Sequence, residues 1–147
     1  MSTFAIDLKW KRETEFIYDK FNRSHTLLFP QSRQTLDASS APEYLGNEDM
    51  TNPEEILASA VSSCHMLTFL AVASKSGYIV DSYEDHAEAI LDKNEEGKPA
   101  ITEVNLHPVI QFSGDKLPTA EQLKSLHDKA HRNCFIANSI KAKVSIS

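Results

Sequence analysis

The stretch from Asn52 to Gly77 constrains the fold more than any other part of the chain, because both of its ends carry helix signals. Asn52 suits a helix N-cap, Pro53 suits the first helical position, and Glu55 can bond back to the cap. Gly77 can adopt the positive φ of a residue that ends a helix. The sequence therefore predicts one long central helix over residues 52–77.

Apolar residues recur along this helix at three- and four-residue steps, a pattern typical of a helix with one face in a core. The stripe comprises Ile56, Leu57, Ala60, Val61, Cys64, Leu67, Thr68, Ala71 and Val72. Met66, Phe69 and Leu70 lie outside it, so more than one face is apolar and a single sheet covers only one of them. A second helix of the same chain or a second subunit must cover the rest.

The residues before the helix alternate between apolar and polar side chains, as β-strands do. We expect strands at 4–10 and 25–29, a less regular extended run at 16–21, and a strand over 33–39 that pairs back. Residues 39–51 lack periodicity and predict a surface loop. The N-terminal part is therefore an antiparallel meander followed by a loop.

The residues after the helix predict a hairpin, a second helix and a last strand. Strands are expected at 79–80, 83–92 and 100–112, with a turn at 94–97, and a final strand at 140–146. Thr119 and Gln122 form a second capping box. The order predicts an α+β fold in one domain, 1–147, made of the meander and loop (1–51), the central helix (52–77) and the remainder (78–147).

Composition excludes several classes of function. The 147-residue chain has a net charge of −6 and no basic stripe, so nucleic acid is not an expected partner. Its first residues do not form a signal sequence, and 58–73 is too polar and too short to span a bilayer, so we expect a cytoplasmic protein without membrane association. A stapling disulfide between the two cysteines is not needed at this size, so their chemistry is of more interest.

Two motifs carry a resemblance to a known family. Residues 51–64 read Thr-Asn-Pro-Glu-Glu-Ile-Leu-Ala-Ser-Ala-Val-Ser-Ser-Cys, and residues 130–134 read Ala-His-Arg-Asn-Cys, shortly before Asn138 and Ser139. These motifs resemble the OsmC/Ohr family of thiol peroxidases, the osmotically inducible and organic hydroperoxide resistance proteins. The similarity covers nearly the whole chain. It implies antiparallel sheets wrapped around a long central helix, in an intertwined homodimer.

The resemblance also implies a reaction and a set of site residues. Cys64 matches the peroxidatic cysteine, Cys134 the resolving cysteine and Glu54 the acidic partner of a catalytic arginine, which matches Arg23, with Arg33 in the same meander. An organic hydroperoxide, for example that of a fatty acid, would oxidise Cys64 to a sulfenic acid, and a Cys64–Cys134 disulfide would follow. A dithiol reductant, a lipoyl protein or a small dithiol, would restore the thiols in an oxidative stress response. No metal or organic cofactor is required.

The arginine and glutamate have a chemical rationale of their own. A guanidinium is always charged, so it can stabilise both a thiolate and a developing alkoxide, and Glu54 would hold it in place. Glu54 and Cys64 are ten residues apart on one helix, or about 15 Å along its axis. They cannot touch within one chain, which favours a site shared across a two-fold dimer. The alternative is an arginine that spans most of the gap inside one subunit.

A different function also fits the sequence. His127, His131 and Cys134 lie on one helical face, and with Cys64 they offer zinc two sulfur and two nitrogen ligands. The alternative function is therefore a non-enzymatic protein that binds a small ligand or zinc, while a solvated helix face is the plainer interpretation. His65 points about 100° away from Cys64 around the helix, which favours a structural role for this histidine.

The chain departs from the commoner family pattern after each of the two cysteines. His65 and Met66 follow Cys64 where many members have an aromatic residue, and Phe135 follows Cys134 in place of proline. The substrate preference of the family therefore does not transfer directly to this chain.

Overall fold

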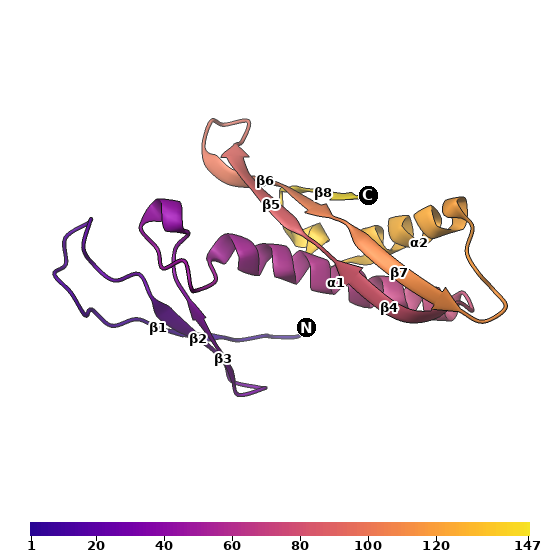
Figure 1. The fold of residues 1–147 in the computed structure, drawn as a ribbon, viewed down its shortest axis with the longest axis horizontal. Coiled ribbons are helices and arrows are strands. Elements are labelled where there is room, and N and C mark those ends of the chain that lie inside the picture. The colour runs from indigo at the N-terminus through magenta and orange to yellow at the C-terminus, as the bar shows by residue number, and fades with distance from the viewer. The chain divides into compact units, whose positions relative to one another are not determined.

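The computed structural model describes residues 1–147, which form two compact units, Met1–Ile56 and Leu57–Ser147. The boundary falls inside the central helix, and each unit is described by itself. Together they contain two long helices and antiparallel sheets (Figure 1), which confirms the predicted α+β class. The single-domain assignment stays a prediction.

The N-terminal unit is built on an antiparallel meander of β1 (Asp7–Lys9), β2 (His25–Phe29) and β3 (Gln34–Ala38), in that order in the sheet. The register sets Leu27 opposite Leu36, and Arg33 adopts a positive φ of 62° in the β2–β3 turn. The meander was predicted correctly. The first strand, however, is only three residues long and exposed on both faces, where one buried face was expected.

The expected extended run at 16–21 is wrong, because these residues form turns. The aromatic rings of Trp10, Phe16 and Phe21 pack against one another, with centroids 5.2–6.5 Å apart. Asn22 closes the loop by accepting from the Glu13 amide at 2.8 Å and donating to the Lys11 carbonyl at 2.9 Å. Local aromatic clustering and these side-chain hydrogen bonds replace strand pairing here.

The loop from Ser39 to Thr51 leads the chain into the helix, as expected, and contains a short 3-10 helix, η1 (Pro42–Tyr44). The Ser39 amide donates to the Thr51 carbonyl at 2.8 Å, next to a parallel bridge between Ala38 and Thr51. Gly46 is required in this loop, since a Cβ there would lie 1.5 Å from the Ser40 carbonyl oxygen. The start of the helix is thereby tied to the end of β3.

The central helix, α1 (Pro53–Lys75), has the predicted ends. Asn52 accepts from the Glu55 amide at 2.9 Å and Glu55 bonds back to the Asn52 amide at 3.3 Å, while Gly77 has a φ of 84°. The predicted buried stripe is partly wrong: Val61 is buried as expected, but the other buried residues of α1 are Ala58, His65, Phe69 and Ala73. An apolar pattern on several faces does not show which face meets the sheet.

By length and composition α1 could cross a membrane. The helix is longer than the stretch 58–73, which was judged from the sequence to be too short to do so. Val61, Phe69 and Ala73 nevertheless have no exposed surface and belong to two core clusters of the C-terminal unit. α1 is therefore a core helix of this fold.

Two β-ribbons follow α1 in the C-terminal unit. β4 (Ile79–Asp85) pairs with β7 (Pro108–Ser113), and β5 (Glu88–Lys93) pairs with β6 (Pro99–Leu106), which lies parallel to β8 (Lys143–Ile146). The two long strands expected at 83–92 and 100–112 are therefore each broken into two. The turn at 94–97 is confirmed, with a φ of 74° at Gly97.

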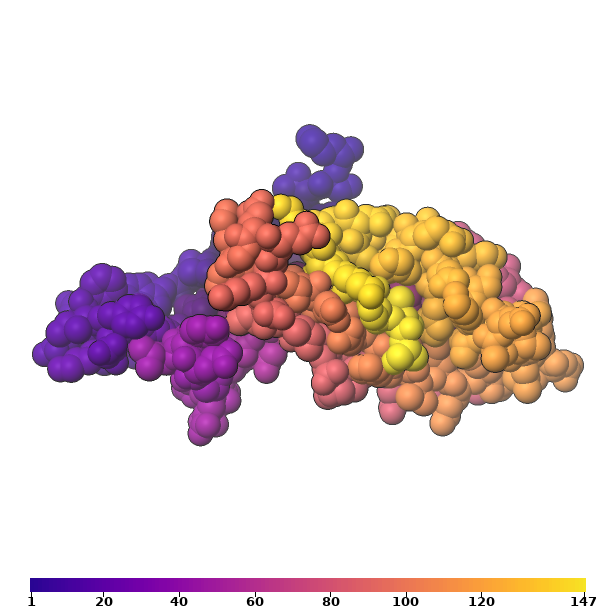
Figure 2. All heavy atoms as spheres, turned by 90° about the horizontal axis from the view of Figure 1, so that it is seen from above, coloured from indigo at the N-terminus to yellow at the C-terminus, as the bar shows by residue number.

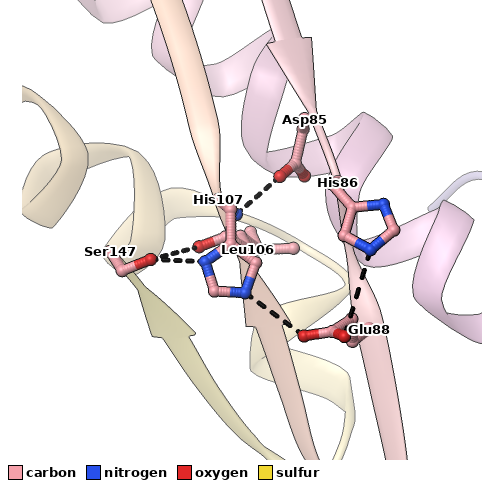
Figure 3. Close-up of polar contacts among 6 residues, drawn as sticks. All are labelled: Asp85, His86, Glu88, Leu106, His107 and Ser147. Carbon is pink, nitrogen blue, oxygen red and sulfur yellow. Dashed lines mark hydrogen bonds and ion pairs between the residues drawn. The ribbon is translucent and has the colours of Figure 1, made fainter.

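Polar contacts link the two interruptions, between β4 and β5 and between β6 and β7 (Figure 3). The amide of His107 donates to Asp85 Oδ1 at 2.7 Å, and the His107 ring contacts Ser147 Oγ at 2.5 Å and Glu88 Oε2 at 3.3 Å. Glu88 also faces His86, at 3.9 Å. His107 thus ties the end of β8 to the β5 side of the sheet, as a surface contact.

The second helix, α2 (Ala120–Asn133), begins with the predicted capping box between Thr119 and Gln122 and is followed by η2 (Ala137–Ser139). Leu126 and Ala130 of α2 belong to the same core cluster as Phe69 of α1. In Figure 2 the atoms of α2 and of the C-terminal segment, amber to yellow, lie together on one face. α2 therefore covers part of α1. This is the first of the two alternatives that the sequence offered, a second helix of the same chain or a second subunit.

Candidate thiol site

The two cysteines come together at the end of α2. Cys64 lies in the middle of α1 and is half-buried, whereas Cys134 is the C-cap of α2 and has no exposed surface. Both are free thiols, and their side chains are hydrogen-bonded to each other. The structure thus brings these two residues of the predicted site together, while their roles stay a prediction.

The surroundings separate the two thiols chemically. Burial raises the pKa of Cys64, but hydrogen bonds from the Cys134 side chain and from the Ile136 and Phe135 amides outweigh this and bring it below its ordinary value. Burial raises the pKa of Cys134, and its bond to Cys64 raises it further. Of the two thiols, Cys64 therefore loses its proton more readily, and Cys134 is the one that donates to it.

The donors to Cys64 come from the way α2 ends. The helix ends at Asn133, Cys134 has extended backbone angles, and the chain then turns tightly into η2. Because Cys134 turns the chain away from the helical path, the amides of Phe135 and Ile136 do not continue the hydrogen bonds of α2 and donate to the Cys64 sulfur instead. The sequence predicted a guanidinium for this purpose and did not indicate that these backbone amides would be the donors.

Arg23 and Glu54 both belong to the N-terminal unit, and they are not paired with each other there. Arg23 donates to the carbonyls of Tyr18 at 2.6 Å and Phe21 at 2.8 Å, with its guanidinium carbon 3.9 Å from the Phe21 ring centroid. Glu54 Oε2 is buried and has no hydrogen-bond partner. The expected ion pair is thus absent from this structure, and a buried carboxylate oxygen is left unsatisfied.

Arg23 lines an apolar pocket of about 430 Å³ within the N-terminal unit. The walls are Trp10, Phe16, Phe21, His25, Ser39, Ser40 and Pro53. Arg33, the alternative arginine, is exposed at the tip of the β2–β3 turn. Of the two candidates, Arg23 is the one presented to a concave apolar surface.

The proposed zinc ligands do not assemble. No three or more His, Cys, Asp or Glu side chains are placed to hold a metal ion, and His127 bonds to His65 at 3.0 Å instead of facing the cysteines. His65 is 1% exposed, so the structural role expected for it is compatible with its position. Its partner was not predictable from a local pattern, because His127 lies 62 residues away.

An α+β fold in which two free cysteines, one on α1 and one at the end of α2, are hydrogen-bonded to each other has the arrangement that thiol-based redox proteins use. Comparison with known proteins is more specific. The sequence profile of OsmC-like proteins matches residues 46–147, more than half of the chain. The chain belongs to the OsmC-like protein family.

Individual relatives agree with this assignment. Peroxiredoxin OsmC of Escherichia coli is 26% identical over 99 residues, which cover 67% of this chain and 66% of that protein, just under two thirds of its length. An OsmC-like protein of unknown function from Vibrio cholerae is 41% identical, with a TM-score of 0.95 over 100% of this chain and 99% of that one.

A third relative shares the fold alone. An organic hydroperoxide resistance protein from Elizabethkingia anophelis is 20% identical, with a TM-score of 0.74 over 100% of this chain and 96% of that one. The sequence resemblance and the OsmC-like fold are therefore confirmed.

Proposed function

We propose that this protein is a cysteine-based peroxidase that reduces organic hydroperoxides. The observation that carries the proposal is the pairing of Cys64, with its lowered pKa, and Cys134, with its raised pKa. A thiolate is the nucleophile in peroxide reduction, and a neighbouring protonated thiol is suited to resolve the product. The peroxiredoxin and hydroperoxide resistance names of the relatives agree with this chemistry.

The reaction has two steps in the protein. The Cys64 thiolate attacks the terminal oxygen of the hydroperoxide, the O–O bond breaks, and the alkoxide takes a proton to leave as an alcohol, with a sulfenic acid on Cys64. The sulfur of Cys134 then attacks the Cys64 sulfur and displaces hydroxide, which leaves as water with the Cys134 proton. Because the two side chains are already hydrogen-bonded, the disulfide requires only a small shift.

An external dithiol completes the cycle. Its thiolate attacks the Cys64–Cys134 disulfide, and its second thiol resolves the mixed disulfide, so that the dithiol is oxidised as both cysteines are reduced. A lipoyl protein or a small dithiol has the required chemistry. The cycle uses no metal or organic cofactor, and it suits a protein of the reducing cytoplasm.

Arg23 and Glu54 are the proposed charged partners. The unsatisfied Oε2 of Glu54 supports this, because a buried carboxylate oxygen without a donor is costly and a guanidinium would satisfy it. Arg23 would leave the carbonyls of Tyr18 and Phe21 to do so. Its charge would then stabilise the alkoxide that leaves as the O–O bond breaks.

We also propose that the working protein is a homodimer. Phe4, Ile6 and Leu8 are 52–88% exposed along and before β1, on a unit too small to cover them. Exposed apolar side chains in a row favour burial against another chain.

Thiol titration tests the proposed function. One equivalent of cumene hydroperoxide should remove both thiols of the wild-type chain, and tert-butyl hydroperoxide should do the same. A ligand-binding protein without peroxidase activity would keep both thiols. Denatured protein, in which Cys64 has lost its donors, is the control and should react far more slowly.

A further inference from the structure

A buried histidine pair lies beside the thiol site and has no part in the proposed reaction. His65 Nε2 and His127 Nδ1 are 3.0 Å apart, the ring planes differ by 8°, and the centroids are 5.3 Å apart. The centroid distance exceeds the N···N distance by about one ring diameter, so the rings lie edge to edge in a common plane. This is the geometry of a direct hydrogen bond between two imidazoles.

The bond has a defined direction. Burial lowers the pKa of both His65 and His127, so both rings are neutral at pH 7, and one must donate while the other accepts. The other nitrogen of His65, Nδ1, is buried and has no partner. A bare acceptor costs less there than an unpaired N–H, so His65 carries its proton on Nε2 and donates it to His127 Nδ1.

This bond joins the two helices that carry the cysteines. His65 follows Cys64 directly on α1, and His127 precedes Cys134 by seven residues, or about 10 Å along α2. The Cys64–Cys134 bond and the His65–His127 bond are therefore two attachments between α1 and α2, well separated along α2. Leu126 and Ala130 also pack with Phe69 between the helices, and the two polar contacts add directional constraints that apolar packing does not supply.

Apolar side chains at positions 65 and 127 would also fill the space between α1 and α2, but they would not form a directional hydrogen bond. Burying two imidazoles costs desolvation that packed leucines would avoid, so the polar pair is a costly way merely to fill the core. A hydrogen bond acts only over a narrow range of distance and angle. The thiol site needs that precision, because its donors are two amides at the end of α2.

We propose that His65 and His127 are positioning residues that hold the end of α2 against Cys64, so that the amides of Phe135 and Ile136 stay aligned with the sulfur. Asp85 of β4, whose carboxylate also bonds to Ser62 of α1, and His131 of α2 face His65 without bonding to it. The consequence for catalysis rests on the proposed function, but the effect on the Cys64 thiolate does not.

Matched substitutions separate the bond from the bulk of the ring. In His65→Gln the side-chain amide nitrogen falls near the position of Nε2 and still donates, and in His127→Asn the amide oxygen falls near Nδ1 and still accepts. His65→Leu and His127→Leu fill similar volumes without the bond. His86→Gln changes an exposed histidine and serves as the control. If a leucine variant does not fold, methionine at the same position replaces it.

The measurement is the pH profile of Cys64 alkylation by iodoacetamide, with the site verified by mass spectrometry. We expect the midpoint to rise by about half a pH unit or more in the two leucine variants, since donors to the thiolate are lost. The Gln, Asn and control variants should keep the wild-type midpoint. Leucine variants that lose stability in urea but keep this midpoint would show a purely structural pair and overturn the proposal.

A second measurement separates this proposal from the proposed function. Alkylation needs no hydroperoxide, so it reports on the positioning role even if cumene hydroperoxide leaves the wild-type thiols untouched. If the wild type is oxidised, the leucine variants should close the disulfide several-fold more slowly, with sulfenic acid trapped by dimedone in the interval. Unchanged closure rates would contradict the positioning role and leave the peroxidase proposal intact.

Discussion

His65 should make the folded protein sensitive to mild acid. Burial lowers its pKa from 6.5 to about 4, and the nearby His127 and His131 act in the same direction, while Asp85 opposes them. Between these two pH values the unfolded chain binds a proton that the folded chain does not. The stabilising contribution is therefore complete above pH 6.5 and is lost progressively as the pH falls through about 4.

The size of the effect follows from the pKa difference. At about 1.4 kcal/mol per pH unit, the fall from 6.5 to about 4 corresponds to at most about 3 kcal/mol, of which about 2 kcal/mol is lost between pH 7 and pH 5. His65 is 1% exposed, so solvent screens this effect little. A loss of this size is a large fraction of the stability of an average domain.

Urea unfolding followed by circular dichroism, at one protein concentration, measures the effect. The free energy of unfolding of the wild type should fall between pH 7 and pH 5 by about 2 kcal/mol more than that of His65→Leu. Carboxylates titrate alike in both proteins, so their contribution cancels in the difference. His86→Gln should behave as the wild type. Parallel pH dependence of the wild type and His65→Leu would refute the reasoning.

Further outcomes are expected for the cysteines, the arginines and the dimer. Cys64→Ser should abolish hydroperoxide consumption, whereas Cys134→Ser should still form a sulfenic acid on Cys64, detected with dimedone, without closing a disulfide; the reverse pattern would exchange their roles. Arg23→Met should slow oxidation of Cys64 by cumene hydroperoxide at least about tenfold, or about 1.4 kcal/mol, and Arg33→Met should not; a loss confined to Arg33→Met would move the role there. Light scattering at micromolar concentration should show the mass of a homodimer. We expect the interface of this dimer to bury more than roughly 2,000 Å² in total. Co-refolding Cys64→Ser chains with Glu54→Gln chains should restore activity if the two residues act in trans, and no recovery would exclude a shared site.

The features that were predictable from the sequence are those fixed by neighbouring residues. Asn52 with Glu55, and Thr119 with Gln122, form the capping boxes that the sequence showed, because a cap involves only residues within one turn. Gly77 ends α1 for the same local reason.

Features that depend on distant residues were not predictable. One of the two predicted long strands is interrupted at His107, whose amide and ring contact Asp85 and Ser147. The other is interrupted just after Asp85. The buried face of α1 includes His65, which no hydropathy pattern places in a core, and its partner is on another helix. The amides that lower the pKa of Cys64 belong to the backbone, so no residue type reveals them.

These backbone donors change what Arg23 has to contribute. The sequence suggested an arginine for both the thiolate and the leaving alkoxide, yet the amides of Phe135 and Ile136, together with Cys134, already lower the pKa of Cys64. The main effect of Arg23 should then fall on the alkoxide that forms as the O–O bond breaks. Alkylation by iodoacetamide releases no alkoxide, so Arg23→Met should leave its rate and pH midpoint unchanged while the hydroperoxide reaction slows. Equal losses in both reactions would instead place the arginine charge on the thiolate itself.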